Sequence, residues 1–219
     1  MNITDPAENL SPSDFDALFR ANGAALLAGT DEAGRGPLAG PVVAAAVILD
    51  SMADYPGLGD SKKLCPAARE KAFNLINEKA LCWAWAKLEA PEVDRLNPLR
   101  AAMTAMAMAV ADLKAAPGLV LVDGNSAPPL TVPLKTVVKG DARSLSIGAA
   151  SIMAKVTRDR IMIEMDKEYP QYGFAKHKGY GTTEHLEALR RHGPCPCHRL
   201  TFRGVKPETP VQGGFNFGS

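Results

Sequence analysis

Four carboxylates in this chain follow apolar, strand-like runs, and they could hold metal ions if the fold brings them together. Asp31 and Glu32 follow the first run, Asp123 follows a second and Asp141 follows a third. Carboxylates packed within a few ångströms repel one another and cannot all stay ionised without cations. Oxygen ligands with few histidines favour Mg²⁺ or Mn²⁺ over Zn²⁺. A pair of such ions, about 3.5–4 Å apart, is a common device for hydrolysing phosphodiesters.

A plainer interpretation of the same acids is also open at this point. Strands often end in an Asp-Gly turn toward solvent, and Asp123-Gly124 has that form. Asp31 and Glu32 are neighbours, so in a regular strand their side chains face opposite sides of the sheet. The glycines at positions 34 and 36 could break this alternation. Residue types alone fit both a two-metal site and ordinary strand-end turns.

The apolar pattern predicts an α/β protein with a mixed sheet and helices on both faces, because strand patterns come early and alternate with helices later. Strands are expected at 24–30, 42–49, 81–88, 119–124 and 135–141. Helices are expected at 11–19, 66–79, 92–116, 144–169 and 183–191. Pro98 is expected to interrupt the third helix. Small residues at 146–151 favour close packing of the fourth helix on the sheet.

The length of 219 residues fits one domain, or one domain with a small appendage, and a hydrophobic content of 46% is enough for a sizeable core. No apolar run approaches the ~20 residues of a membrane helix, and the first residues carry no secretory signal. Four cysteines without disulfide-framework spacing indicate a reduced, cytoplasmic setting. Basic residues and all four histidines gather in 171–206, which is compatible with a polyanionic partner or with an ordinary solvated face.

Seven ordered segments carry a resemblance to one family. The first, Asp31-Glu-Ala-Gly-Arg-Gly-Pro-Leu-Ala-Gly-Pro-Val42, resembles the opening motif of the type 2 ribonucleases H, specifically bacterial ribonuclease HII. The others match in the family's order at 60–64, 122–124, 139–141, 149–159, 178–182 and 198–202. The resemblance covers roughly residues 23–205, and seven ordered matches make it very specific.

The resemblance implies a ribonuclease H-like fold, with a five-stranded mixed sheet flanked by helices and a small helical C-terminal extension at about 170–205. Residues 1–22 would form an N-terminal extension with a short helix, 23–205 the catalytic domain and 206–219 a disordered tail. The implied activity is endonucleolytic cleavage of the RNA strand in RNA–DNA hybrids. It includes incision 5′ of single ribonucleotides in duplex DNA, leaving 3′-hydroxyl and 5′-phosphate ends. A non-catalytic hybrid-binding protein of the same fold is the alternative.

The resemblance also assigns the chemistry to residues. The family's catalytic, metal-binding carboxylates match Asp31, Glu32, Asp123 and Asp141. In the family they hold two divalent ions, Mg²⁺ or Mn²⁺, during catalysis.

Substrate recognition is assigned in the same way. The family's ribonucleotide-reading turn matches Gly34, Arg35 and Gly36, and its 2′-hydroxyl sensor matches Tyr180. Further substrate contacts are expected from Ser61 and Lys62, and phosphate positioning from Lys62, Lys139, Lys155 and Lys178. Only a 2′-hydroxyl distinguishes an embedded ribonucleotide from DNA. A glycine turn lets backbone groups approach that sugar without a Cβ in the way.

One cysteine-rich segment stands apart from these assignments. Cys195-Pro-Cys197-His198, together with His192, offers zinc-ligand types, but the spacing matches no standard pattern and no zinc site is predicted. Both cysteines replace residues that the family commonly has there.

The C-terminal tail carries a short aromatic motif. Gln212, Phe215 and Phe217 resemble a sliding-clamp-binding peptide, and a random glycine-rich terminus is the alternative. The expected partners are thus RNA–DNA hybrids, ribonucleotide-containing DNA and a sliding clamp, with no membrane. The chain is expected to be a monomer.

Overall fold

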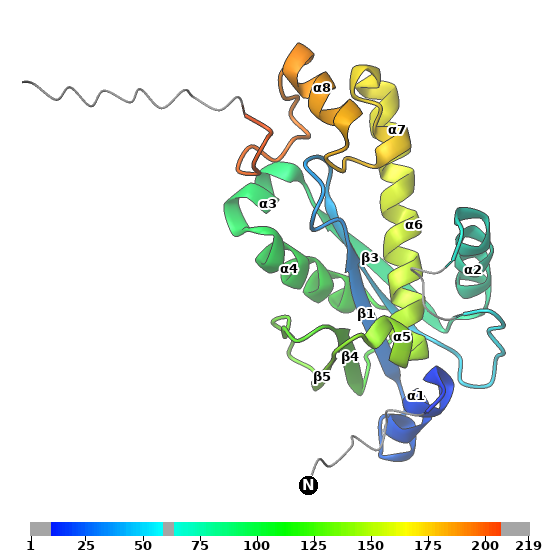
Figure 1. Cartoon of the computed structure of the whole chain (residues 1–219). Coiled ribbons are helices and arrows are strands. Elements are labelled where there is room, and N and C mark those ends of the chain that lie inside the picture. Colours follow the sequence, from blue (N-terminus) through cyan, green and yellow to red (C-terminus); the bar gives the residue numbers. More distant parts are fainter. Residues whose placement is uncertain (1–9, 59–63, 207–219) are drawn as a thin grey trace, which may run out of the picture.

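A five-stranded mixed sheet forms the centre of the computed structural model, which describes residues 10–58 and 64–206. The strand order is β3-β2-β1-β4-β5 (Figure 1). β2 pairs antiparallel with β1 and β3, whereas β4 pairs parallel with β1 and β5. The strands are β1 (Leu27–Ala33), β2 (Val42–Ile48), β3 (Cys82–Leu88), β4 (Leu119–Asp123) and β5 (Leu134–Val137). The mixed sheet expected from the sequence is confirmed.

Helices cover both faces of this sheet. The long α6 (Leu145–Glu168) crosses one face with α2 (Pro66–Lys79) beside it, and α4 (Pro98–Ala111) covers the other (Figure 1). The shorter elements are α1 (Pro12–Ala21), α3 (Ala90–Leu96), α5 (Gly140–Arg143), the 3₁₀ turn η1 (Pro170–Tyr172), α7 (Phe174–His177) and α8 (Thr183–His192). None of the described helices is both long and apolar enough to cross a membrane.

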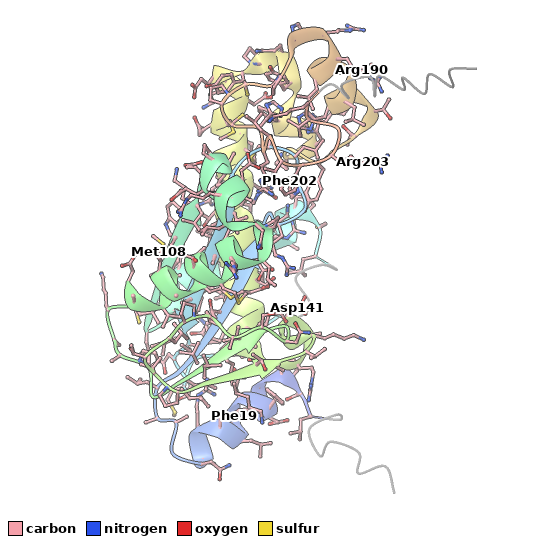
Figure 2. All side chains as sticks on the ribbon, turned by 90° about the vertical axis from the view of Figure 1, so that its left-hand side faces the viewer. Phe19, Met108, Asp141, Arg190, Phe202 and Arg203 are labelled. Carbon is pink, nitrogen blue, oxygen red and sulfur yellow. The ribbon has the colours of Figure 1, made fainter. Side chains whose placement is uncertain are left out.

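The molecule is elongated, with α1 at one end and α8 at the other. Figure 2 shows Asp141 toward the α1 end, and Arg190, Phe202 and Arg203 toward the α8 end. The elements α7 and α8 lie beyond the C-terminal end of α6, as expected of a small helical extension.

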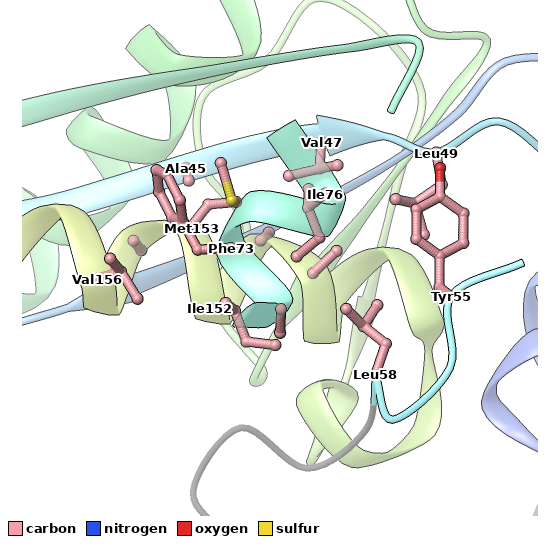
Figure 3. Packing of buried hydrophobic residues seen from close by; sticks show 14 residues of the cluster. Ala45, Val47, Leu49, Tyr55, Leu58, Phe73, Ile76, Ile152, Met153 and Val156 are labelled. Atoms are coloured by element: carbon pink, nitrogen blue, oxygen red, sulfur yellow. The ribbon is translucent and has the colours of Figure 1, made fainter. Parts of the chain in front are cut away.

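The core lies on both faces because every residue of β2 is buried. Ala45 and Val47 face α6, and Phe73 and Ile76 of α2 close the same cluster (Figure 3). On α6 the small residues allow a very close approach to β1. A Cβ at Gly29 would overlap the backbone of Ser146, so only glycine fits there.

Three predicted elements differ from the observed ones. β1 begins at Leu27 and continues through the acidic pair to Ala33, because these residues stay paired with β2. The strand expected at 135–141 ends at Val137, and Asp141 instead lies on the short helix α5. For the helix expected at 92–116, the interruption predicted at Pro98 is confirmed and the bounds differ, since the two helices span Ala90–Leu96 and Pro98–Ala111. Asn97, at φ 69°, separates α3 from α4 and caps α4 with its side chain.

The N-terminal helix α1 is tied to the start of α6 by a buried carboxylate. Asp16 accepts hydrogen bonds from Ser144 Oγ at 2.6 Å, and from the amide and hydroxyl of Ser146 at 2.8 and 2.6 Å. Burial raises the pKa of Asp16, and these hydrogen bonds oppose the rise. Phe15 adds an apolar anchor in the cluster that contains Leu121 and Ile147.

Candidate active site

The parallel pairing of β1 with β4 brings two of the predicted carboxylates together. Thr30 lies opposite Val122, so the next residues, Asp31 and Asp123, are neighbours at the strand ends. Asp31 is 5% exposed. It lies on the α6 face of β1, since Gly29 two residues earlier touches Ser146 of α6.

The carboxylate of Asp31 is held in an unfavourable electrostatic setting. Burial raises the pKa of Asp31 well above its ordinary value, and the charges of Glu32 and Asp123 raise it further. A hydrogen bond from Ser151 and one from the Glu32 amide, at 2.7 Å, oppose this rise. Burial also raises the pKa of Glu32. The Arg35 guanidinium opposes this rise, since its Nη1 lies 3.1 Å from Glu32 Oε1. A nearby cation would relieve this repulsion.

Adjacent residues of one strand reach the same cavity because β4 stops beside Asp31. Glu32 faces the α4 side, where it lines a hollow of about 150 Å³ with Leu99, Met103 and Asp123. Beyond the end of β4 it also borders the larger cavity, of about 500 Å³, that contains Asp31 and Asp123. The side chains therefore alternate as in any strand, and the open strand end unites them.

Asp141 takes a different position from the one its sequence context suggested. It is 4% exposed and is not among the residues that line the larger cavity. The amides of Gly140 and Asp141 lie 2.7 and 3.3 Å from Asp123 Oδ1, so the start of α5 orients Asp123. The role of Asp141 as a fourth catalytic carboxylate stays a prediction.

The predicted reading turn lies on the same cavity as the acids. Gly34 and Arg35 line it, and so does the half-exposed Tyr180. Gly34 has φ 98°, and a Cβ there would overlap Arg158, so this position requires glycine. A Cβ at Gly36 would lie 3.9 Å from the Tyr180 ring, which places the turn and the tyrosine side by side.

Two buried arginines that received no role from the sequence bind the backbone of this turn and of the segment that follows it. Arg199 Nη2 donates to the carbonyls of Gly34 at 2.6 Å and Gly40 at 2.8 Å, and its Nη1 donates to that of Arg35 at 2.9 Å. Arg158 donates to three further carbonyls, those of Ala39, Pro41 and Lys178. Burial, with Arg158 nearby, lowers the pKa of Arg199 to about 9. Both arginines occur in matched segments, but sequence cannot distinguish a buried arginine from a solvated one.

The basic residues expected to hold phosphates are only partly placed. Lys155 lines the cavity, where its Nζ lies 2.7 Å from Asp159, and Arg69 of α2 is a further lining cation. Ser61 and Lys62 lie outside the described residues. Substrate contacts by these residues stay predictions.

Comparison with known proteins identifies the family and the fold of the chain. The sequence model of the family Ribonuclease HII matches residues 28–205. The chain is 55% identical over 192 residues to Ribonuclease HII of Geobacter metallireducens, covering 88% of this chain and 90% of that protein. It is 56% identical over 195 residues to Ribonuclease HII of Albidiferax ferrireducens, covering 89% and 94%. The crystal structure of ribonuclease H2 from Pyrococcus horikoshii OT3 superposes with a TM-score of 0.70 at 28% identity, over 82% of this chain and 94% of that one.

The central strands of the mixed sheet end in acids that line an open cavity, and the fold is similar to that of the ribonuclease H2 structure. Together these features define a ribonuclease H-like nuclease. The relatives and the family match make the assignment narrower. The chain belongs to the ribonuclease HII family, endonucleases that hydrolyse the RNA strand of RNA–DNA hybrids. The fold class and the family expected from the sequence are confirmed.

Proposed function

We propose that this enzyme also incises duplex DNA 5′ of a single embedded ribonucleotide, using two divalent cations and leaving 3′-hydroxyl and 5′-phosphate ends. The observation that carries the proposal is the shared cavity. The acids Asp31, Glu32 and Asp123 and the recognition elements Gly34 and Tyr180 all line it. Cleavage chemistry and recognition of a sugar can therefore act on neighbouring atoms of one nucleotide.

The residues present fit Mg²⁺ or Mn²⁺. Asp31, Glu32 and Asp123 offer hard oxygen ligands, and their mutual repulsion is the cost that cations would remove. When bound, such ions supply an activated water and neutralise charge at the leaving oxygen. Asp123 is oriented for ligation by the amides at the start of α5, and Asp31 by Ser151.

Recognition of the ribose is assigned to the turn and to Tyr180. Arg199 fixes the turn by binding the carbonyls of Gly34 and Arg35. Gly34 has no Cβ, so its backbone can lie close to a bound sugar. Tyr180 offers a ring for stacking and a hydroxyl for a hydrogen bond. Arg35 and Lys155 contribute charge for phosphates, which positions a nucleic acid without reading its sequence.

The decisive experiment compares three labelled duplexes: one with a single ribonucleotide, one RNA–DNA hybrid and one of DNA alone. Each is incubated with Mg²⁺, with Mn²⁺ or with EDTA, and product ends are mapped. We expect cuts 5′ of the ribonucleotide and throughout the hybrid, no cut in DNA, and no cut with EDTA. Cleavage of the hybrid alone would refute ribonucleotide incision. Binding without cleavage under every condition would favour the hybrid-binding alternative.

A further inference from the structure

A second group of potential metal ligands lies outside the carboxylate cavity, near α7 and α8. Cys195 Sγ, Cys197 Sγ and His198 Nδ1 lie within 4.8 Å of one another. The two sulfurs are 2.8 Å apart, and His198 Nδ1 is 3.1 Å from Cys195 Sγ. Cys197 and His198 are buried and Cys195 is half-buried, so water reaches the group from one side. The turn at 195–198 brings the three side chains together, although their spacing in the sequence matches no standard zinc-binding pattern.

The hydrogen bonds around His198 fix the tautomer that a metal ligand needs. His185 Nδ1 lies 2.9 Å from the Tyr180 carbonyl, which only accepts, so this nitrogen carries the proton. In a neutral His185 ring, Nε2 then accepts from His198 Nε2, 3.0 Å away. The lone pair of His198 is therefore on Nδ1, which lies 3.1 Å from Cys195 Sγ and accepts a hydrogen bond from the Cys195 amide at 3.0 Å, so a bound ion would take the place of this amide. A ligating histidine characteristically donates its other ring N–H to a carboxylate, a backbone carbonyl or water, and His185 Nε2 takes that place here.

The same group is held by its surroundings. The His198 ring packs against Tyr172 and Phe174, with ring centroids 4.8 and 5.5 Å apart. The His198 amide donates to the Cys195 carbonyl at 3.0 Å, which closes the turn. The Cys197 carbonyl accepts from the Gly40 amide at 2.9 Å, which joins the turn to the segment after the reading turn. The backbone of the turn is thus held in place before any ion arrives, and only the ligand side chains have to adjust.

We propose that Cys195, Cys197 and His198 bind one Zn²⁺ ion, with water in the fourth position. Two thiolates and one imidazole nitrogen suit zinc and do not suit Mg²⁺. Zn–S bonds of about 2.3 Å in a tetrahedral shell place the sulfurs about 3.8 Å apart, so the two side chains must open by about 1 Å. The site is separate from the carboxylate cavity and does not depend on the proposed ribonucleotide incision.

Occupancy of this site would act on the reading turn through the backbone. Cys197 holds Gly40, and Arg199, two residues further on, holds Gly34 and Arg35. An ion that fixes residues 195–198 would therefore stiffen the segment that positions the turn. The expected role is structural, because none of the three ligands lines the carboxylate cavity.

The test is a Co²⁺ titration of the reduced, metal-free full chain in excess Mg²⁺, which occupies carboxylates but not thiolates. We expect one Co²⁺ per chain with a thiolate-to-metal charge-transfer band, displaced by one equivalent of Zn²⁺. Cys195→Ser and Cys197→Ser should each weaken binding by more than about 10-fold, since losing even an outer partner of a ligand costs about that much. The matched control is Cys65→Ser, at an exposed free cysteine, which should bind as the wild type does.

A measurement on the unaltered chain guards against misfolded variants. Under reducing conditions, Zn²⁺ should raise the unfolding temperature of the wild type and of Cys65→Ser, and not that of Cys195→Ser. Absence of the charge-transfer band, or of any Zn²⁺ effect on the wild type, would overturn the proposal. So would a band that survives both cysteine substitutions. If Cys195 and Cys197 form a disulfide, and the chain binds no Zn²⁺ after that disulfide is reduced, the pair would be assigned to redox chemistry instead.

Discussion

Arg199 offers the sharpest test of how the reading turn is held. In Arg199→Lys, one ammonium replaces a planar fork that serves the carbonyls of Gly34, Arg35 and Gly40. At least one buried carbonyl loses its charged donor, which costs about 1.5–3 kcal/mol. We therefore expect the free energy of unfolding, from urea denaturation, to fall by about that amount. The contact between the cation and the Phe202 ring, 5.1 Å from its centroid, is compatible with either cation and should contribute little to the difference.

The control for this change is Arg203→Lys, at an exposed position in the same segment, which should alter stability by less than about 0.5 kcal/mol. If the proposed recognition is right, Arg199→Lys also lowers the rate on an embedded ribonucleotide more than the rate on a hybrid. A stability within about 0.5 kcal/mol of the wild type would refute the reasoning, because it would mean that the fork carries no net energy. If Arg199→Lys is less stable than the wild type but has the same ratio of rates on the two substrates, Arg199 supports the fold and does not contribute to recognition.

Four further expectations concern the acids, the tyrosine, the α1 anchor and the close approach of α6 to β1. Asp123→Asn should abolish cleavage while hybrid binding, measured by gel shift, persists; full activity would remove Asp123 from the site. Tyr180→Ala should slow incision at one ribonucleotide, and an equal rate in single-turnover kinetics would exclude the tyrosine from recognition. The folded Asp16 carboxyl keeps its proton to a higher pH than the unfolded one. Its contribution to stability therefore falls as pH rises from 3.8 through the folded pKa, and Asp16→Asn should remove that slope in urea titrations at several pH values. Gly29→Ala should destabilise the fold by several kcal/mol, on the order of an overpacked core, and calorimetry showing a wild-type unfolding temperature would contradict the observed contact.

The convergence of the acids could be predicted from the sequence only in part. Residue types alone left ordinary strand-end turns open, and the family resemblance favoured a shared site. Asp31, Glu32 and Asp123 each follow an apolar run. The strands that end at the same edge of a sheet bring their last residues together, however many residues separate those strands in the sequence. Asp141 shows the limit of the same logic. Its run Lys135–Val138 resembles a longer strand, but Lys139 turns the chain at φ 54° and starts a helix.

Contacts between distant segments could not be predicted in this way. Arg158 and Arg199 bind backbone carbonyls more than one hundred residues away in the sequence. Every residue has such a carbonyl, so the residue types do not indicate which carbonyls an arginine will bind. The Cys195–His198 group depends on a turn conformation that linear spacing does not encode. The predicted clamp-binding residues Gln212, Phe215 and Phe217 lie outside the described residues, as do Ser61 and Lys62. Clamp binding therefore stays a prediction, and so does the cytoplasmic location.

The parallel register of β1 and β4 has a consequence for how this sequence can vary in length. The connection from β2 to β4 can gain or lose residues in its loops without moving Asp31 relative to Asp123, because only strand pairing relates them. A single residue inserted within β4, between Leu119 and Asp123, would send the acid to the opposite face of the sheet. The placement of Asp31 beside Asp123 is therefore tolerant of long insertions elsewhere, yet one residue inserted in a five-residue strand would abolish it.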